Sequence, residues 1–316
     1  MRIFRSMAEI PAGFGPSAVT IGNFDGMHWG HRQIMRRTVT VSKAQALVPV
    51  VLTFDPHPAA VLAPERAPKL IMTIDQRLRA MQAEGIEAVF LLPFSVEFAR
   101  QSAEQFAQEV LHNTLDARVV LVGEDFRFGY KQAGTIDTLR ALGAQMNFTM
   151  EAIAPILRRG QRISSSAIRS LIAEGRVSRA CRMLGAPLAL EGNVVRGQGI
   201  GARQTVPTLN LAVESGVLPG HGVYVTTTSD LESPRRWRSI TNVGVRPTFN
   251  GDDLTVETFL LEPLTGESPK RIEVRFLSYI RSEVRFDTPE ALKARIMKDI
   301  ALAGRVHRRL AKYGVG

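Results

Sequence analysis

The stretch AVTIGNFDGMHWGH, residues 18–31, contains an entire transition from a strand through a tight turn to a helix. Its first four residues, Ala18–Ile21, form the kind of short apolar run that predicts a buried strand. Gly22, Gly26 and Gly30 then allow tight turning and a close approach of the backbone to a ligand. A helix that starts directly after such a turn presents free backbone N–H groups and the positive end of its dipole. We therefore expect an anion-binding site at this turn.

Two histidines stand at the start of the expected helix. His28 and His31 are three residues apart, so both side chains project from one face of the first turn. Imidazoles in that place can donate hydrogen bonds to the phosphates of a nucleotide. The alternative is that one or both histidines only fill polar gaps. The pattern HxGH after a strand and a glycine-rich turn favours phosphate binding over that alternative.

The remainder of the first half repeats this order of strand and helix. Amphipathic stretches of helical length, of which Phe98–Leu111 is the clearest, lie between further apolar runs. Those runs are Val48–Phe54, Ala88–Leu92, Val119–Val122 and Thr149–Ile153. Strands separated by a helix length pair in parallel, because only a crossover connection returns the chain to the same edge. Residues 1–184 are therefore expected to form a doubly wound α/β domain, whose ligands bind beyond the carboxyl ends of the strands.

A different pattern begins after residue 184, where the sequence LGAP ends the preceding helix. Short apolar runs follow one another with only turns rich in Gly, Pro, Ser and Asp between them: Leu190–Arg196, Thr208–Val213, Gly222–Thr228, Trp237–Val243, Leu254–Leu261 and Ile272–Leu277. Without helices between them, such strands are antiparallel and close into a small barrel. Thr288 and Pro289 then suit the first turn of a C-terminal helix. We expect residues 185–316 to form a six-stranded antiparallel β-barrel with that helix, so the predicted fold class is α/β plus β.

A second segment of the first half supports an anion site. ISSSAIRSLIAEG, residues 163–175, places three hydroxyls at the start of an expected helix, with Arg169 about one turn further along. In one interpretation the serines only cap the helix. In the other, the backbone amides, the hydroxyls and Arg169 bind the β- and γ-phosphates of a nucleotide. The second interpretation becomes stronger when this segment is paired with HxGH.

The composition is that of a folded, basic protein. Of the 316 residues, 45% are hydrophobic and 22% are charged, which excludes disordered and collagen-like chains. Lys+Arg 40 against Asp+Glu 30 gives a net charge of +10, which predicts attraction to anions such as nucleic acid, phospholipid or nucleotide phosphates. Only seven of the cations are lysine, so an arginine-biased genome explains the skew better than a dedicated nucleic-acid surface.

A single cysteine, Cys181, excludes an intramolecular disulfide and argues against a cysteine-based zinc cluster. Without a partner motif for a nucleophile, we interpret it as a small buried side chain. The N-terminus lacks the apolar core of a secretory signal, and no uncharged apolar run approaches the ~20 residues needed to cross a bilayer. We therefore expect a cytoplasmic protein with no membrane partner.

Further motifs occur in both halves, in an order that is typical of one family. Besides the two phosphate segments there are TFDPHP at 53–58, VGEDFRFG at 122–129, GNVVRGQGIG at 192–201, VPTLN at 206–210, GVYV at 222–225, NVGVRPTF at 242–249 and VETFLL at 256–261. In these motifs the chain resembles the bacterial bifunctional riboflavin kinase/FAD synthetase family, whose first module belongs to the HxGH nucleotidyltransferases. The resemblance implies ATP, riboflavin, FMN and FAD as substrates and products, and Mg²⁺ as the cofactor.

For the first module, the resemblance implies two groups of binding residues. Those that surround ATP are Asn23, His28, His31, Ser164, Ser165 and Arg169. Those that lie near the flavin nucleotide or the metal are Phe54, Pro58 and Asp125. For Asp125, and for Asp25 in the first turn, a loop-forming carboxylate that accepts backbone N–H groups is an alternative. The implied reaction needs no protein nucleophile, because an oxygen of the FMN phosphate attacks the α-phosphorus of ATP.

For the second module, strand spacing and resemblance together indicate a site for magnesium and ATP. Thr208 and Asn210 are two apart on an expected strand, so they share a face and offer two oxygen ligands, which suits Mg²⁺. The expected ATP contacts are Gly197 and Gly201, in a glycine-rich loop, and Pro207 at the start of the strand. The resemblance makes Glu257 the base that takes the proton of the riboflavin 5′-hydroxyl, the alternative being a glutamate on a solvated face.

The second module departs from the family pattern just before this strand. The family usually reads Gly-Arg-x-x-Gly-Phe-Pro-Thr-x-Asn. In this chain Ala202 stands at the Arg position, so the arginine has moved by one residue, to Arg203, or been lost, and Thr205 and Val206 stand at the second Gly and Phe positions. Glu262-Pro263 stands where an acidic-aromatic pair is usual. Our leading hypothesis is an enzyme that performs both steps, and the nearest alternative is FAD synthesis alone with a degraded barrel. An alternative of another class is a basic nucleic-acid-binding protein on a nucleotidyltransferase scaffold, which the lack of a recognisable nucleic-acid-binding motif disfavours.

Overall fold

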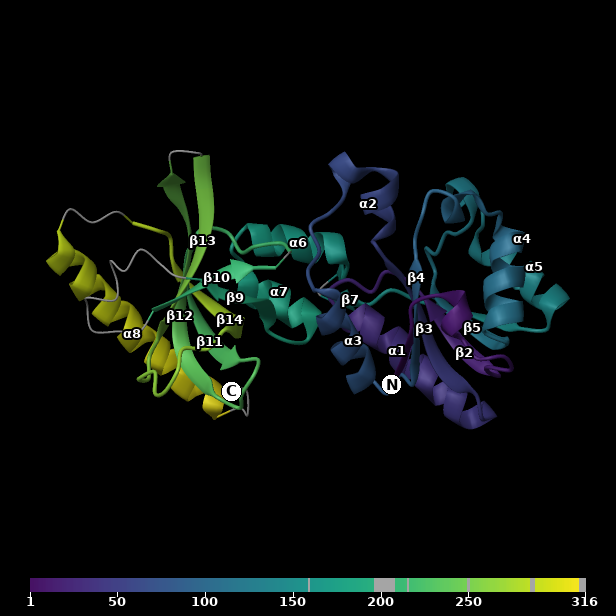
Figure 1. The fold of residues 1–316 in the computed structure, drawn as a ribbon, viewed down its shortest axis with the longest axis horizontal. Helices are drawn as coiled ribbons and strands as arrows, with labels where there is room; N and C mark the ends of the chain where they lie inside the picture. Colours follow the sequence, from purple (N-terminus) through teal and green to yellow (C-terminus); the bar gives the residue numbers. More distant parts are fainter. Residues whose placement is uncertain (159, 196–207, 215, 249–250, 285–287, 313–316) are drawn as a thin grey trace. The chain divides into compact units, whose positions relative to one another are not determined.

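Two compact units divide the chain, Met1–Ser165 and Ser166–Gly316. The computed structural model describes residues 1–158, 160–195, 208–214, 216–248, 251–284 and 288–312, with the backbone alone for 245–248, 251–254 and 289. The first unit is built on a parallel sheet and the second on a closed antiparallel barrel (Figure 1), so the predicted fold class of α/β plus β is confirmed.

The sheet of the first unit has the strand order β1-β4-β3-β2-β5-β6, with all neighbours parallel. Its strands are β1 Arg2–Phe4, β2 Ser17–Ile21, β3 Val48–Asp55, β4 Ala88–Pro93, β5 Ala117–Gly123 and β6 Thr149–Ile153. The five strands predicted from apolar runs all occur in it, because strands covered on both faces are apolar throughout. The edge strand β1 was not predicted, since three residues are too few to show a period.

Helices cover both faces of this sheet, with α1 and α3 on one side and α4 and α5 on the other (Figure 1). The helices are α1 Trp29–Gln45, α2 Pro58–Leu62, α3 Ile74–Ala83, α4 Ala103–Phe106 and α5 Ile136–Met146. Alternate residues of a strand point to opposite faces. Leu52 of β3 accordingly packs with Phe106 and Leu139, whereas its neighbour Val51 packs with Met35 and Leu78.

The amphipathic stretch Phe98–Leu111 is not one regular helix. A 3₁₀ turn over Phe98–Arg100 is followed by α4 and then by a π-helical segment over Ala107–Thr114. Ser102 separates the first two, because its side chain accepts from the backbone N–H of Gln105 and so caps a new helix. The apolar face is nevertheless buried as the period indicates.

The second unit contains the closed barrel, in the order β10-β13-β12-β11-β14-β9. All of its neighbouring strands are antiparallel, as predicted. The strands are β9 Leu188–Val195, β10 Thr208–Val213, β11 Gly222–Asp230, β12 Arg236–Thr248, β13 Gly251–Leu260 and β14 Arg271–Arg281; the short strands β7 Leu157–Arg158 and β8 Gln161–Arg162 form a separate hairpin in the first unit.

The C-terminal helix α8, Pro289–Ala311, packs on the outside of the barrel (Figure 1). The Thr288 side chain caps it by accepting from the backbone N–H of Ala291 at 3.2 Å. Ala303 of the helix packs against Val225 and Ile240 of the barrel, on the outer face of β11 and β12. None of the helices in the described part of the chain combines the length and the apolar composition that a bilayer crossing requires.

The helices α6 Ser165–Ala173 and α7 Val177–Leu184 lie almost wholly in the second unit. The Ser178 hydroxyl on α7 donates to the carbonyl of Leu277 on β14 at 3.2 Å. The thiol of Cys181 accepts from the N–H of Leu188 at 3.3 Å, and burial raises its pKa. The compact units thus divide before these two helices, whereas the sequence boundary at residues 184 and 185, which stays a prediction, follows them.

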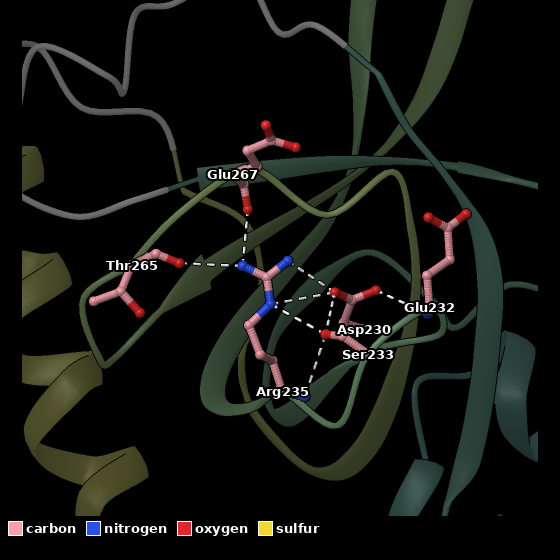
Figure 2. A network of polar contacts seen from close by, with 6 residues as sticks. All are labelled: Asp230, Glu232, Ser233, Arg235, Thr265 and Glu267. Atoms are coloured by element: carbon pink, nitrogen blue, oxygen red, sulfur yellow. Dashed lines mark hydrogen bonds and ion pairs between the residues drawn. The ribbon is translucent and has the colours of Figure 1, made fainter.

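A network of polar side chains closes the hairpin between β11 and β12 (Figure 2). The Nη2 group of Arg235 donates to Oδ2 of the buried Asp230 at 2.9 Å. Its Nη1 group donates to the carbonyls of Thr265 and Glu267, at 3.1 and 2.8 Å. The network therefore ties the hairpin to the connection between β13 and β14.

Candidate functional site

The loop after β2 lies at the point where the strand order of the sheet reverses. The chain continues from β2 to β3 and β4 on one side, and later to β5 and β6 on the other. In such sheets the crevice beyond the carboxyl ends of the two central strands binds ligands. The loop Gly22–His28 after β2 and the loop after β5, which contains Asp125, flank this point. Of the predicted residues, Phe54 lies near the end of the neighbouring strand β3, and Pro58 follows that strand at the start of α2.

The loop Gly22–His28 has a conformation that needs support. Phe24 and Met27 have φ of 49° and 43°, in the left-handed region that non-glycine residues seldom adopt. Gly26, at φ 83°, is the residue type that suits this region. Strained backbone of this kind persists only where surrounding groups fix it.

Asp25 provides part of that support. Its carboxylate is 2% exposed and accepts the backbone N–H of Ile71 at 2.9 and 3.0 Å, and that of Met72 at 3.2 Å. These two amides immediately precede α3. Of the interpretations left open for Asp25, the contacts agree with the loop-forming carboxylate.

Arg77 on α3 provides the other part. It is 2% exposed, and its Nη1 donates to the backbone carbonyl of Asn23 at 2.8 Å. Burial lowers the pKa of Arg77, an effect that the charges of Asp25 and Asp55 partly offset. The buried guanidinium of Arg77 therefore stabilises the loop by donating a hydrogen bond to one of the loop's own carbonyls.

The two histidines lie face to face at the start of α1. Their ring centroids are 3.6 Å apart and the rings are 19° from parallel. His28 is the N-cap residue, and its Nδ1 accepts from the backbone N–H of His31 at 3.3 Å. An imidazole nitrogen that accepts carries no proton, so in the neutral ring the proton is on Nε2. His28 thus has a donor on the side away from the helix.

Both histidines are neutral at pH 7. Burial lowers the pKa of His28 to about 4, with the charge of Arg162 lowering it further and a backbone hydrogen bond opposing the change. Burial lowers the pKa of His31 well below its ordinary value, and the neighbouring His28 acts in the same direction. Protonation therefore requires a compensating negative charge beside the rings.

Several other predicted residues of the first site make contacts at the same edge of the sheet. The Ser165 hydroxyl, at the start of α6, donates to the carbonyl of Asp25 at 2.9 Å. Asp125, which is exposed, pairs with Arg162 at 2.5 Å. Phe54 meets Phe94 edge to face, with ring centroids 5.6 Å apart.

The predicted polar residues of the barrel stand on one face of it. Asn210 of β10 lies directly opposite Glu257 of β13, and Thr208 lies opposite Phe259. Thr208, Asn210 and Glu257 are partly exposed, whereas the residues that alternate with them on these strands are buried. Two oxygen donors and a carboxylate thus share an outer face, a donor set that fits Mg²⁺.

Two protein families match the two units of the chain. Residues 12–167 match the family described as FAD synthetase, and residues 184–307 match the family described as riboflavin kinase. A protein named bifunctional riboflavin kinase/FMN adenylyltransferase, from Buchnera aphidicola, is 30% identical over 96% of this chain and 97% of its own length. The chain belongs to the bifunctional riboflavin kinase/FMN adenylyltransferase family.

One further member of the family and one solved structure are similar to this chain over most of its length. The bifunctional riboflavin kinase/FMN adenylyltransferase of Escherichia coli strain K12 is 32% identical over 89% of this chain and 90% of its own length. A crystal structure titled as a macrolide-efflux protein from Streptococcus pneumoniae superposes with a TM-score of 0.86, at 28% identity, covering 95% of this chain and 97% of that one. The fold shared with this solved structure thus covers both units.

Several predicted residues lie either outside the described part of the chain or, in the case of Arg169, in the second unit. Gly197, Gly201 and Pro207 lie outside the described residues, as do the departures Ala202, Thr205 and Val206. Arg169 lies on α6 in the second unit, and Ser164 immediately precedes that helix. The further departure Glu262 accepts from the backbone N–H of Arg238 at 2.8 Å, a contact within the barrel.

Sequence reasoning missed two residues that lie beside the residues of the candidate sites. Arg77 lies in an ordinary amphipathic stretch, and nothing local distinguishes it from an exposed arginine. Asn242 of β12 lies opposite Glu257 in the barrel. It begins the motif NVGVRPTF, which carried part of the resemblance but gave no reason to single out its first residue.

Proposed function

We propose that the chain makes flavin nucleotides in two steps that each consume ATP. Riboflavin and ATP give FMN and ADP in the barrel, and FMN and ATP give FAD and pyrophosphate at the parallel sheet. The observation on which this proposal chiefly rests is that one chain contains two separate sets of polar groups suited to ATP. They are the paired imidazoles after β2 and, on adjacent strands of the barrel, Asn210, Glu257 and Asn242, the Glu257 row. Both steps use ATP, which supports the expectation of a cytoplasmic enzyme.

In the adenylyl transfer, an FMN phosphate oxygen forms a bond to the α-phosphorus of ATP, and the bond to pyrophosphate breaks. Alignment and neutralisation of charge are enough for such a step. The Nε2–H of His28 faces away from the helix and can donate to the triphosphate. The negative charge of the bound nucleotide raises the low pKa of His28 and His31. The imidazoles therefore become better hydrogen-bond donors when the nucleotide is bound.

The remaining predicted residues of the first site keep the roles that family membership suggests. Gly22 and Asn23 lie beside ATP, while Ser164, Ser165 and Arg169 bind the β- and γ-phosphates. Phe54, Pro58 and Asp125 lie toward the flavin nucleotide.

In the phosphoryl transfer, Glu257 accepts the proton of the riboflavin 5′-hydroxyl. That oxygen then forms a bond to the γ-phosphorus of ATP, and ADP leaves. Thr208 and Asn210 would hold Mg²⁺, which supplies positive charge to the phosphates when bound. Gly197, Gly201 and Pro207 complete the proposed ATP contacts.

The test supplies the full chain with riboflavin, ATP and magnesium, and separates the flavins by chromatography. Both FMN and FAD are expected. An enzyme limited to FAD synthesis would make FAD only when FMN replaces riboflavin, and this result would overturn the kinase half of the proposal.

Single substitutions then assign each step to its site. His28→Ala should lower FAD formation about 100-fold or more and leave FMN formation intact, because it removes a donor to the reacting phosphates. Glu257→Gln should do the reverse. His112→Ala, in the first unit outside the loop, is the matched control and should change neither step. Parallel loss of both activities in a folded His28→Ala protein would contradict two separate sites.

A further inference from the structure

Three aromatic side chains stand in a row at the start of α1. The ring of Phe24 meets the ring of His31 edge to face, with centroids 5.3 Å apart and an interplanar angle of 85°. This arrangement is one that aromatic rings prefer. His31 in turn stacks on His28, with centroids 3.6 Å apart. Phe24, His31 and His28 together are the ring row.

A glycine borders the ring row at each end. A Cβ atom on Gly22 would lie 3.1 Å from Cζ of Phe24. A Cβ atom on Gly30 would lie 3.2 Å from Cε1 of His28. Both separations are shorter than the 3.4–4 Å of an ordinary van der Waals contact, so each glycine leaves the space into which a ring packs.

The backbone of Phe24 is fixed on both sides in a conformation that it would seldom adopt alone, with φ of 49°. The preceding residue, Asn23, accepts a hydrogen bond from Arg77 through its carbonyl at 2.8 Å. The following residue, Asp25, accepts the backbone N–H of Ile71 at 2.9 Å. Strain that the surrounding structure imposes in this way is a feature of functional sites.

The side chain of Phe24 is buried as firmly as its backbone is fixed. It is 3% exposed and lies in an apolar cluster with Met35 of α1 and with Leu78 and Met81 of α3. Protein interiors are close-packed, so a ring that moved away from His31 would leave a void or overpack this cluster. The ring of Phe24 is therefore a rigid surface against which His31 rests.

The two imidazoles differ in what orients them. His28 has a backbone contact, because its Nδ1 accepts the N–H of His31 at 3.3 Å. The buried Nδ1 of His31 makes no hydrogen bond within the described part of the chain. The plane of the His31 ring therefore depends on the rings that it touches.

We propose that Phe24 is a positioning residue for the adenylyl transfer, whose ring fixes the plane of His31 and thereby that of the stacked imidazole pair. Groups that are aligned before the reaction lower its barrier, and a small misplacement lowers the rate. The strained conformation of Phe24 then has a purpose, which is to hold its ring between Gly22 and His31. This inference rests on the role of the two imidazoles in the proposed function.

The test is Phe24→Leu in the full chain, which keeps an apolar side chain in the cluster and removes the flat ring. With FMN, ATP and magnesium, kcat for FAD formation should fall about tenfold and the KM for ATP should change little, because misalignment acts on the reacting state. FMN formation from riboflavin should be unchanged. The NMR signals of the His31 ring protons should also move, since an aromatic ring shifts the signals of protons beside it.

Phe14→Leu is the matched control. Phe14 is 7% exposed and meets Phe4 edge to face, with centroids 5.5 Å apart and an interplanar angle of 83°. It precedes β2, whereas the ring row follows that strand. Phe14→Leu should lower the stability to urea to a similar extent and leave kcat and the histidine signals unchanged.

Gly22→Ala provides a second measurement if Phe24→Leu does not fold. It displaces the Phe24 ring without removing it, because the added Cβ lies 3.1–3.3 Å from three atoms of that ring, so the His31 signals should move again. Unmoved His31 signals in either folded variant, or an unchanged kcat in folded Phe24→Leu, would overturn the inference.

His28→Ala, measured in parallel, separates the two claims. If it still makes FAD at the full rate, the imidazoles do not act in the transfer, and the inference falls together with that part of the proposed function. An impaired His28→Ala beside an unaltered Phe24→Leu refutes only the role of Phe24.

Discussion

The groups proposed to meet ATP in the first unit belong to a loop and a helix start, whereas those in the barrel stand on adjacent strands. The loop Gly22–His28 contains two non-glycine residues with positive φ and is held by Asp25 and Arg77. Asn210, Glu257 and Asn242 need no such support, because the hydrogen-bonded ladder fixes their order.

This difference predicts where each site is vulnerable. The geometry of the loop depends on the buried side chains of Asp25 and Arg77, which are not among the proposed ATP contacts, so their substitution should still impair FAD formation. Strand register is fixed by many backbone hydrogen bonds at once, so single side chains outside the Glu257 row should affect the stability of the barrel more than its chemistry. The two tryptophans allow the units to be followed separately, since Trp29 begins α1 and Trp237 lies on β12.

Arg77→Met should have the largest effect. It removes the Arg77 hydrogen bond to the Asn23 carbonyl and leaves the nearby carboxylates of Asp25 and Asp55 without this countercharge, which costs about 3–5 kcal/mol of unfolding free energy. Displacement of the loop should lower the rate of FAD formation about 100-fold. Urea unfolding followed by Trp29 fluorescence in a Trp237→Phe background measures the first effect, and chromatography of the flavins the second.

The matched control for this change is Arg140→Met, which removes an exposed arginine paired with Asp137 and should cost at most about 1 kcal/mol. Arg77→Lys keeps the charge without the planar fork and should fall between the two. Equal loss of FMN and FAD formation in a folded Arg77→Met protein would show that the loop is not selectively supported.

The pH dependence of stability should come next in size. The pKa of His28 is about 4 in the folded chain, below its ordinary value of 6.5, so the unfolded chain binds more protons between these pH values. Stability of the first unit should therefore fall as the pH is lowered through this window, by about 2 kcal/mol between pH 7 and pH 5 from His28 alone. His28→Gln should lack this part of the loss in urea titrations followed by Trp29. His221→Gln, at an exposed histidine, should keep it.

The parts of the fold that could be predicted are those with a local cause. The apolar run before Gly22 and the glycine-rich turn after it gave the strand, the turn and the helix start correctly, because all three depend on neighbouring residues. Thr208 and Asn210 were placed on one strand face for the same reason, since side chains alternate along any strand.

Long-range contacts could not be predicted in this way. The guanidinium of Arg77 meets a carbonyl 54 residues earlier in the chain, and its sequence neighbourhood shows nothing of this. The position of Asn242 opposite Glu257 depends on the register of β12 and β13, which a single strand pattern does not contain. The stretch Phe98–Leu111 is interrupted at Ser102, which caps α4. An amphipathic period does not show whether a serine caps a helix or lies within one.

Asp230→Asn should destabilise the barrel by about 2 kcal/mol and leave both reactions unchanged. The polar network around Asp230 in Figure 2 lies at the β11–β12 hairpin, outside the Glu257 row. Trp237 fluorescence in a Trp29→Phe background reports the loss. Burial raises the pKa of Asp230, but hydrogen bonds from Ser233, the amide of Glu232 and Arg235 outweigh it, so the pKa lies below the ordinary 3.8.

The carboxylate of Asp230 therefore stabilises the barrel above about pH 4, and this contribution is lost as the pH falls through the lowered folded-state pKa. As the pH falls, the unfolding free energy of the first unit should begin to decrease at a higher pH than the contribution of Asp230 to the barrel does. Asp137→Asn, at an exposed ion pair, is the control and should change little. Loss of FMN formation in a folded Asp230→Asn protein would contradict the expectation that Asp230 contributes to the stability of the barrel and not to its reaction.

The smallest effect is expected for Thr73→Ala, at the cap of α3. Thr73 and Gln76 form a capping box directly after Ile71 and Met72, the residues whose amides Asp25 holds. Loss of the cap should cost about 1 kcal/mol, measured with Trp29. Thr135→Ala removes a similar capping box from α5, which packs on the opposite face of the sheet from α3, and should cost about the same. Of these two variants, only Thr73→Ala should also slow FAD formation, since α3 carries Arg77 and starts beside the amides that Asp25 accepts. Equal FAD kinetics in the two variants would show that the start of α3 does not affect the geometry of the site.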